Sequence, residues 1–254
     1  MKITVLVDNT SLIDRYYLAE PAFSLYIEEG NKHILFDTGY SDVVIQNAAA
    51  MHIDLNQIDT IVLSHGHNDH TGGLRYLCEL KQDIDVIMHP DCFNEKSYEG
   101  LDVSAPLKEL PANFHLVKTR DAYKISDRLL FMGEIKRTVF AHRWLENDPL
   151  YDDSALLYQG EKGIFIMSGC AHSGICNIVE QALSTSGFEH ISGILGGFHM
   201  QNDPKYNREV ADYMKQKDIE MLYPCHCTDL MAKITLSSVC KLKEIGVSTT
   251  LEVS

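Results

Sequence analysis

The sequence has few basic residues for its length and no long hydrophobic run. Lysine and arginine number 22 against 36 aspartate and glutamate residues, which gives a formal net charge of −14. This deficit of positive charge argues against a nucleic-acid backbone or an anionic membrane surface as the main partner. No apolar run approaches the roughly 20 residues that a membrane-spanning helix needs. Residues 1–9 do not have the pattern of a signal peptide, because Asp8 interrupts an apolar strand.

Disulfide frameworks and flexible linkers are also lacking. The seven cysteines are an odd number at irregular spacing in a chain of 254 residues. That pattern is typical of reduced thiols or metal ligands in a cytoplasmic protein. No stretch is rich in serine, glycine and proline, and 45% of the residues are hydrophobic, which is enough for a substantial core. We therefore predict a single cytoplasmic domain over residues 1–254. No feature of the sequence specifies an oligomeric state.

Several apolar runs end abruptly in side chains that can bind a ligand. Runs of four to six apolar residues are typical of strands buried on both faces. The residues that follow these runs include Asp37, His65, His89, Cys170, His199 and His226. Since functional sites of α/β proteins gather at the carboxyl ends of strands, we expect these loops at one edge of the sheets. The fold class predicted is α/β, with helices outside the sheets.

Helical patterns lie between several of the strands. Residues 178–183, 210–214 and 231–245 carry apolar stripes, and Gly187 is a candidate C-cap of the first. Two strands on either side of Gly30 predict a hairpin. From residue 92 to residue 150 the periodicity weakens and prolines are frequent. We interpret residues 92–150 as a cap over the site or an insertion.

Four metal-binding side chains fall within six residues, directly after a predicted buried strand. They are His65, His67, Asp69 and His70. Imidazole nitrogen and carboxylate oxygen suit Zn²⁺, Mn²⁺ and Fe²⁺, and four such groups in one turn exceed what one ion readily accepts. We therefore predict two divalent metal ions, zinc first, with manganese or iron as alternatives. The alternative is that these four residues belong to a solvated polar loop that binds no metal.

These residues carry a family resemblance. Residues 64–73, SHGHNDHTGG, resemble the His-x-His-x-Asp-His motif of the metallo-β-lactamase superfamily, and residues 36–39 resemble its first motif. Residues 168–170, 196–199 and 225–228 are similar to one branch, which includes the dihydropterin-linked ribofuranosylaminobenzene-phosphate synthases of the methanopterin pathway. The resemblance implies a four-layer αββα sandwich with a two-metal site at the sheet edge. It implies that His65 and His67 bind the first metal, and that Asp69, His70 and His226 bind the second.

The chain departs from the superfamily pattern near residue 170. Many relatives carry a third histidine and then Ser-Gly-Asp, whose aspartate bridges the metals. Here Cys170 occupies the place of that aspartate, and residues 151–154 hold no histidine. We predict that His172 is the third nitrogen ligand of the first metal. The alternative is that His172 contacts substrate while Asp153 or Cys170 binds the metal. Cys225 and Cys227 flank His226 and, on a strand, would both point to the face opposite to it. They are therefore expected to be packed thiols, with a Cys-His-Cys metal set left open.

A two-metal site implies hydrolysis by a bridging hydroxide that is nucleophilic at neutral pH. Asp69 would orient that hydroxide, and His199 is a candidate proton donor to the leaving group. Two other roles of His199, as a metal ligand and as a structural histidine, remain open. The predicted function is a metal-dependent hydrolase of an ester, phosphoester or amide, or a phosphoryl-linked condensation as in the branch above. The substrate is a small molecule, and an anionic or phosphorylated one suits a site made positive by bound cations.

Two other functions compete with hydrolysis. A di-iron redox protein of the same fold would need a flavin partner, and the chain contains no flavin-binding module. A non-catalytic ligand-binding member of the fold is the second, and the intact ligands weigh against it. Asp37 is predicted to support the loop through hydrogen bonds to backbone and to a metal-binding histidine. His89, His115 and His142 are interpreted as ordinary surface or strand-end residues.

Overall fold

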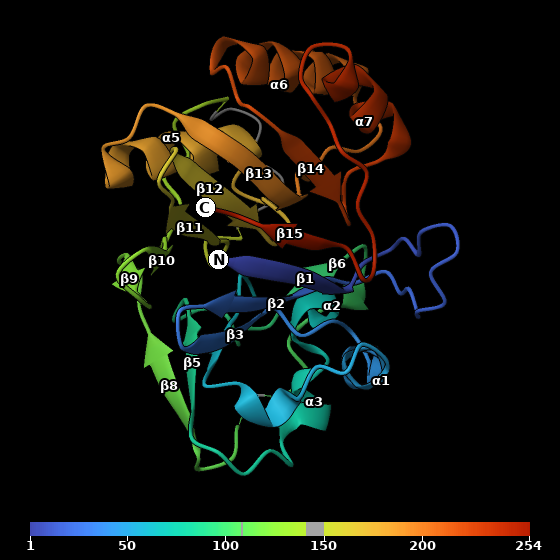
Figure 1. Ribbon diagram of the computed structural model, residues 1–254, viewed down its shortest axis with the longest axis vertical. Coiled ribbons are helices and arrows are strands. Elements are labelled where there is room, and N and C mark those ends of the chain that lie inside the picture. Colours follow the sequence, from blue (N-terminus) through green and yellow to red (C-terminus); the bar gives the residue numbers. More distant parts are fainter. Residues whose placement is uncertain (108, 141–149) are drawn as a thin grey trace. The chain divides into compact units, whose positions relative to one another are not determined.

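The computed structural model describes residues 1–107, 109–140 and 150–254, which divide into two compact units (Figure 1). Unit 1 comprises residues 1–120 and 246–253, and unit 2 comprises residues 121–245 and Ser254. His142 lies outside the described residues, as does part of the predicted cap. Each unit contains one main sheet and its own helices.

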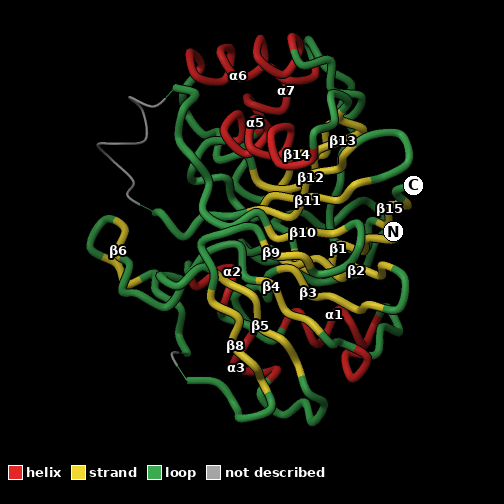
Figure 2. Tube along the Cα trace, turned by 90° about the vertical axis from the view of Figure 1, so that its left-hand side faces the viewer, coloured by secondary structure: helices red, strands yellow, loops and turns green. Residues whose placement is uncertain are grey.

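The sheet of unit 1 has seven strands in the order β15-β1-β2-β3-β4-β5-β8. The strands are β1 (Lys2–Val7), β2 (Ser24–Glu29), β3 (Lys32–Phe36), β4 (Thr60–Val62), β5 (Ile84–Met88), β8 (Phe114–Lys118) and β15 (Thr250–Glu252). The predicted hairpin is confirmed, since β2 and β3 are antiparallel and Gly30 takes a φ of 62° in the turn. From β3 to β8 all pairings are parallel, and these strands lie side by side in Figure 2. The carboxyl ends of β3, β4 and β5 therefore meet at one edge.

The helices of unit 1 are short. They are α1 (Val43–Ala50), a 3₁₀ helix (Leu55–Gln57), α2 (Asn68–Thr71) and α3 (Leu74–Leu77), and a two-stranded hairpin is formed by β6 (Ser97–Tyr98) and β7 (Leu101–Asp102). Val44 of α1 and Leu74 of α3 are fully buried in one cluster with strand residues such as Ile61. The burial of these apolar side chains holds the segment between β4 and α3, which carries the histidine cluster, against the sheet.

The sheet of unit 2 has six strands in the order β14-β13-β12-β11-β10-β9. Its strands are β9 (Tyr123–Lys124), β10 (Leu129–Phe131), β11 (Ala155–Gln159), β12 (Ile164–Ser168), β13 (Ile191–Gly197) and β14 (Leu222–Cys225), and its helices are α5 (Ile175–Ser186), α6 (Pro204–Gln216) and α7 (Leu230–Ser237). Strands β12, β13 and β14 are parallel, so their carboxyl ends also share an edge. The helices bury apolar side chains in the same cluster as β12 and β13.

Helix ends test the sequence predictions in detail. Gly187 caps α5 in a left-handed conformation, as predicted, and its N–H bonds the Leu183 carbonyl at 3.0 Å. The helix predicted over residues 231–245 is wrong in its extent, because α7 ends at Ser237. The Ser237 and Ser238 hydroxyls donate hydrogen bonds to the Ile234 and Thr235 carbonyls, and such side-chain bonds compete with the helix. The chain beyond then bridges to β14, with the Leu222 N–H bonded to the Lys241 carbonyl.

The described part of residues 92–150 serves several structural roles. Strand β8 extends the sheet of unit 1, and β9 and β10 belong to the sheet of unit 2. Before β8, residues 96–104 form a loop around the β6–β7 hairpin, where the Lys96 N–H bonds Ser104 Oγ at 2.8 Å. Among the described residues of the predicted cap, residues 92–107 form one continuous part that lies outside both main sheets.

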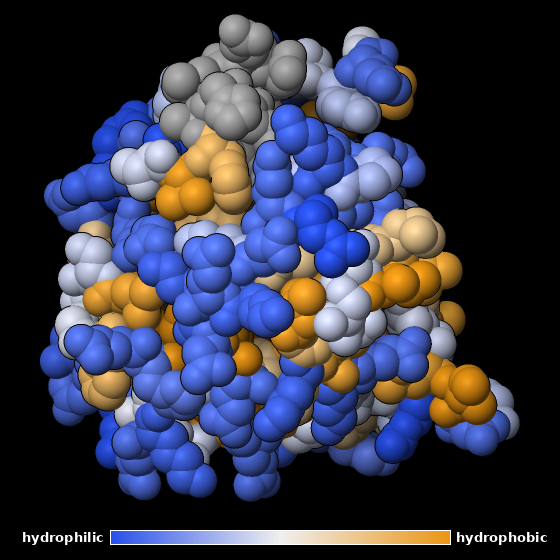
Figure 3. Space-filling view, turned by 90° about the horizontal axis from the view of Figure 1, so that it is seen from above, coloured by the Kyte–Doolittle hydropathy of each residue, from blue (hydrophilic) through white to orange (hydrophobic). Residues whose placement is uncertain are grey.

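The surface is mostly hydrophilic. Figure 3 shows one face on which hydrophilic residues predominate and hydrophobic residues form small groups. On α7, Leu230, Met231 and Ile234 are exposed by 71%, 61% and 50%. Among the described residues, no helix is both long enough and apolar enough to cross a membrane.

Candidate metal centre

Asp37 organises the strand ends of unit 1. It follows β3, takes a φ of 57° and is fully buried. One carboxylate oxygen accepts the Ser64 N–H at 2.7 Å, and the other accepts the Ser64 hydroxyl and His70 Nδ1, both at 2.7 Å. These are the contacts predicted for Asp37, to backbone and to a histidine of the motif. A buried carboxylate with three hydrogen bonds holds the loop after β4 in one geometry.

These hydrogen bonds define which ring nitrogen of each histidine carries its proton. The Ser64 hydroxyl donates its hydrogen to Asp37, so its oxygen accepts from His65 Nδ1 at 2.9 Å. His70 Nδ1 likewise donates to Asp37. Both imidazoles are therefore held with the proton on Nδ1, and each presents the lone pair of Nε2, which is the form that binds a metal.

The ligand atoms of the motif converge. His65 Nε2 lies 3.1 Å from His67 Nδ1, and His70 Nε2 lies 3.7 Å from Asp69 Oδ2. The rings of His65 and His70 have centroids 4.2 Å apart. Two nitrogens bound to one tetrahedral zinc ion lie about 3.4 Å apart, so the separation of 3.1 Å in the His65–His67 pair fits a metal with little movement. The residues of this cluster thus suit the divalent ions predicted from the sequence.

Two glycines let the backbone fold under the cluster. A Cβ built on Gly66 would overlap the Cys92 carbonyl, and one built on Gly73 would overlap the Thr38 carbonyl. The Thr38 N–H in turn bonds the His70 carbonyl at 2.7 Å. Any larger residue at either glycine would push the motif away from the strand ends that hold it.

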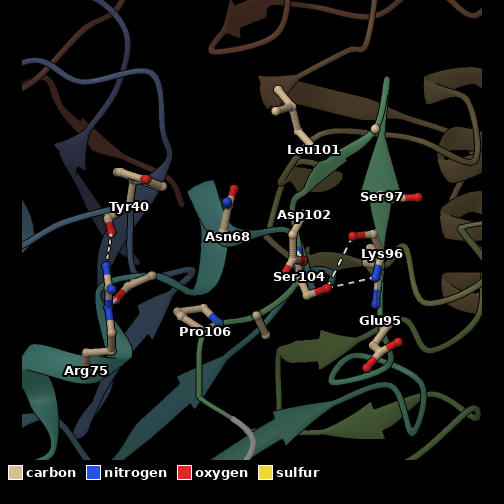
Figure 4. Close-up of a pocket in the computed structure, with 13 residues that line it drawn as sticks. Tyr40, Asn68, Arg75, Glu95, Lys96, Ser97, Leu101, Asp102, Ser104 and Pro106 are labelled. Atoms are coloured by element: carbon tan, nitrogen blue, oxygen red, sulfur yellow. Dashed lines mark hydrogen bonds between the residues drawn. The ribbon is translucent and has the colours of Figure 1, made fainter.

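A cavity of about 700 Å³ lies beside the motif within unit 1. Asn68, which stands between the ligands of the motif, lines it together with Arg75, Lys96 and Leu101 (Figure 4). The Arg75 guanidinium donates to the carbonyls of Gly72 and Tyr40, and Lys96 Nζ to the carbonyl of Cys92 among others. The volume is in the range of pockets that bind small molecules, and residues 95–106 contribute much of the wall.

The strand ends of unit 2 carry a different set of side chains. Cys170 follows β12, His199 follows β13 and Cys227 follows β14. Cys170 Sγ lies 2.9 Å from Cys227 Sγ and 3.4 Å from His199 Nδ1. The His199 N–H donates to Cys227 Sγ at 3.3 Å. Two sulfurs and an imidazole therefore meet at one point of this edge.

The surroundings of Cys227 favour its thiolate. Burial by itself raises the pKa of the Cys227 thiol, but the hydrogen bond from Cys170 and the nearby His226 and His199 bring that pKa well below its usual range. Cys176, which lies on α5, shows the opposite case, since burial raises its pKa strongly. The two residues differ in their hydrogen-bond donors and neighbouring imidazoles.

Asp153 and His172 interact electrostatically in unit 2. Asp153 is fully buried, and its Oδ2 accepts the Ser173 N–H at 2.8 Å and the Ser173 hydroxyl. Burial raises the pKa of the Asp153 carboxyl, while His172 and Ser173 oppose that shift. The rings of His172 and His199 have centroids 4.3 Å apart. His172 is 5% exposed, so its imidazole belongs to the buried edge of unit 2.

The structure places the predicted site residues in two groups. His65, His67, Asp69 and His70 lie together in unit 1, and His172 and His199 lie together in unit 2. His226 directly follows β14 in a left-handed conformation, with a φ of 49°. This φ breaks the strand alternation by which Cys225 and Cys227 were expected to share a face. Cys225 is a packed thiol, as expected, but Cys227 contacts Cys170.

The remaining histidines have partners of their own. His89 is fully buried, and Arg120 Nη1 lies 3.0 Å from its Nε2. His115 is about half exposed and lies 3.3 Å from Asp83. These contacts account for His89 as a strand-end residue and for His115 as a surface residue.

A comparison with protein families decides the classification. The model of the metallo-β-lactamase superfamily matches residues 18–177, which include the first motif, the histidine cluster and Cys170. An uncharacterized protein of Methanocaldococcus jannaschii, MJ0448, is 33% identical to this chain, over 93% of this chain and 94% of its own length. The chain belongs to the metallo-β-lactamase superfamily. The predicted α/β fold of the metallo-β-lactamase type is thereby confirmed.

Two further relatives show the range of activities in the superfamily. A 7,8-dihydropterin-6-methyl-4-(beta-D-ribofuranosyl)-aminobenzene-5'-phosphate synthase of M. jannaschii is 29% identical over 92% of this chain and 89% of its own. The crystal structure of Tm1679, a metal-dependent hydrolase of the beta-lactamase superfamily, aligns with a TM-score of 0.86 and 25% identity over 100% of this chain and 99% of its own. Proteins similar over their whole length thus include both a hydrolase and a synthase.

Proposed function

We propose that the protein is a metal-dependent hydrolase that binds two divalent ions and acts on an ester or phosphoester of a small molecule. The observation that carries this proposal is the Asp37–Ser64 hydrogen-bond chain. It holds the protons of His65 and His70 on Nδ1 and leaves Nε2 of each to a metal. A polar loop without function would have no need of such an arrangement, whereas metal-binding histidines usually have it.

We assign the ligands of the two ions as the superfamily pattern implies. His65 and His67 hold the first ion, with His172 as third nitrogen. Asp69 and His70 hold the second, with His226. Membership of the superfamily supports this assignment, because the matched residues 18–177 include His65, His67, Asp69, His70 and His172.

When bound, two divalent ions would supply an activated water and polarise the substrate. The Asp69 carboxylate, 30% exposed, orients the attacking water. His199 is proposed as the proton donor to the leaving group, through Nε2, since its Nδ1 faces Cys170 at 3.4 Å. Burial of His65 and His70 keeps bulk water from their ligand nitrogens.

The cavity next to Asn68 is proposed as the substrate pocket. Its lining by Glu95, Lys96 and Leu101 supports the proposal that residues 92–107 are the cap of the site. Arg75 and Lys96 place cationic side chains in the wall, and Glu95 and Asp102 place carboxylates there. The proposal of an anionic substrate therefore rests on the charge of the bound ions. Zinc is the ion proposed first, with manganese and iron as alternatives. The seven cysteines all lie among the described residues and none forms a disulfide, which supports the proposal of a cytoplasmic location.

A second candidate function is a condensation of the synthase type. The similarity to the M. jannaschii synthase over 92% of this chain supports it. The same ligands would then serve a phosphorylated substrate in a phosphoryl-linked condensation. Formation of a condensed product from a phosphorylated ribofuranosyl donor, with no hydrolysis of the ester panel below, would favour this function.

The test combines metal analysis with substrate screening. Protein purified without oxygen would be loaded with Zn²⁺, Mn²⁺ or Fe²⁺, analysed for bound metal, and assayed on phosphomonoesters, phosphodiesters, thioesters and lactones. We expect two ions per chain and hydrolysis of at least one class, abolished by a chelator and restored by the metal. His65→Ala should lose both metal and activity, and His115→Ala, a change of an exposed histidine, should lose neither. A loading that never exceeds one ion per chain contradicts the two-ion assignment, and two ions without turnover contradict the hydrolase.

A further inference from the structure

The thiols of Cys170 and Cys227 form a pair at the strand ends of unit 2. Their sulfurs are 2.9 Å apart, although 57 residues separate them in the chain. We propose that this pair is a redox site, which a hydroperoxide converts into a disulfide and a dithiol reductant restores. The disulfide-forming step needs neither a metal ion nor turnover of a substrate, so it is tested separately from the hydrolase function.

The strand between the two cysteines is built to let them meet. Strand β13 lies between β12 and β14, so a side chain at its end would stand between the two thiols. That position is Gly197, and a Cβ there would lie 2.6 Å from Cys227 Sγ and 3.1 Å from Cys170 Cα. Only glycine leaves this gap, and the thiols of the flanking strands fill it.

The distance between the sulfurs lies midway between that of a disulfide and that of two thiolates on one zinc ion, and the hydrogen bonds of the pair favour the disulfide. Two thiolates on one tetrahedral zinc ion lie roughly 3.8 Å apart, since zinc–sulfur bonds are about 2.3 Å long. The sulfurs here would have to separate by nearly 1 Å to bind zinc together. To form a disulfide of about 2.05 Å they would approach each other by a similar amount, in the direction that their mutual hydrogen bonding already takes. Cys227 Sγ also lies 3.3 Å from the Cys170 carbonyl, which orients it toward that residue.

The two cysteines differ in access. Cys227 is partly exposed, whereas Cys170 is 5% exposed. A hydroperoxide would therefore react first at Cys227, whose sulfur attacks one peroxide oxygen as the O–O bond breaks. The thiol proton leaves with the other oxygen, as water when the reagent is hydrogen peroxide, and Cys227 becomes a sulfenic acid. The Cys170 sulfur then displaces that hydroxyl, which leaves as water with the Cys170 proton. Two thiols are oxidised and one peroxide is reduced.

The experiment is a thiol count and peptide map of the purified full-length protein. The protein is treated with a small excess of hydrogen peroxide, the remaining thiols are alkylated, and the digest is analysed without reduction. We expect the number of free thiols to fall from seven to five, with the peptides of Cys170 and Cys227 joined as the main product. A dithiol reductant should return the count to seven.

Variants and outcomes complete the test. Cys227→Ala should form no such cross-link, and Cys225→Ala, which removes the packed thiol two residues away, should still lose two thiols. The peptide map of the unmodified sequence needs no variant, so it stands even if a variant folds poorly. The proposal is overturned if the wild-type protein loses no thiols, or if either cysteine accumulates as sulfinic acid without a cross-link. A cross-link between other cysteines at equal yield would overturn it as well.

Discussion

In each unit, side chains at neighbouring strand ends meet, but the chemistry of these side chains differs between the two units. In unit 1, Asp37 joins the residues after β3 and β4: it accepts hydrogen bonds from Ser64 and His70, and Ser64 in turn contacts His65. In unit 2, the residues after β12, β13 and β14 meet through two sulfurs and an imidazole. The first arrangement holds protons in defined places and leaves imidazole nitrogens for a metal, which suits divalent ions such as zinc. The second offers polarizable sulfur, which suits redox chemistry.

The comparison also separates a contiguous motif from a dispersed one. Residues 65–70 lie in one turn of chain, so their convergence depends on local structure and one carboxylate. The unit 2 cluster depends on three strands in the correct parallel register. Changes in unit 1 should therefore act on metal binding directly, whereas changes in unit 2 should distinguish ligands from neighbours.

The largest effect is expected from Asp69→Ala. It should lower kcat by about 10³-fold, because it removes both a ligand and the group that orients the attacking water. Metal analysis should show the loss of one ion while His65 and His67 keep the other. Asp83→Ala removes an exposed carboxylate and should change neither value. Equal loss of both ions would show that the partition of ligands is wrong.

The next comparison sets His172→Ala against Cys170→Ala in unit 2. If His172 is the third nitrogen ligand, its removal should weaken binding of one ion by more than about 100-fold, because even outer partners of a ligand contribute 10–100-fold. Cys170→Ala should keep both ions. Chelator competition measures both affinities. Full occupancy in His172→Ala together with loss of an ion in Cys170→Ala would make the thiol the ligand.

Asp37→Asn tests the hydrogen-bond chain of unit 1. The amide keeps the shape but donates where the carboxylate accepts, so the protons of Ser64 and His70 lose their acceptor. Metal affinity should fall by about 10–100-fold, with the fold retained by circular dichroism. Asp54→Asn, at an exposed helix cap, serves as the control. An unchanged affinity would mean that the chain is structural only.

Leu101→Ala tests the cap. Leu101 is 67% exposed and lines the cavity beside Asn68, so its truncation should change the ratio of kcat/KM between substrates by roughly 10-fold. Metal content should stay the same. Leu116→Ala, a change of an exposed leucine on β8, should leave the ratio unchanged. Equal effects from both variants would show that residues 92–107 do not take part in substrate binding.

The smallest effect is expected from Asp203→Ala, away from both clusters. Asp203 caps α6 through the Tyr206 N–H at 3.0 Å, and loss of a cap lowers the free energy of unfolding by about 1 kcal/mol. Denaturant unfolding measures it, with Asp212→Ala on the exposed face of the same helix as control. Metal content should be unchanged, and a change in it would mean that α6 communicates with the metal ligands.

Features formed by residues close together in the sequence were predicted, whereas the cluster formed by residues far apart in the sequence was missed. The strand that precedes His65, the turn at Gly30 and the cap at Gly187 follow from local patterns, and each is present. The Cys170–Cys227 pair was missed because a left-handed His226 ends the alternation on which the orientation of Cys227 was inferred. The Gly-Gly end of β13 was the available signal, since a strand end without side chains leaves room for its neighbours.

The helix that was predicted too long has a similar cause. Residues 231–245 carry a helical stripe, but the Ser237 and Ser238 hydroxyls donate to the Ile234 and Thr235 carbonyls, and the chain then turns back to pair with β14. Tertiary pairing outweighs local propensity there. Ser64 shows what sequence reasoning could not reach at the site. The residue stands next to His65 in the sequence, but its role depends on a hydrogen bond to Asp37, which lies 27 residues earlier.

Strand β15 has a consequence for how the protein is made. It closes the outer edge of β1 in unit 1, yet its residues follow all but one residue of unit 2 in the chain. Synthesis proceeds from the amino terminus at about 5–20 residues per second, so β1 waits on the order of ten seconds for its partner. During that time its unpaired N–H and carbonyl groups are open to strands of other nascent chains. The molecule is thus most exposed to aggregation while unit 2 is being synthesised, before the last strand is available.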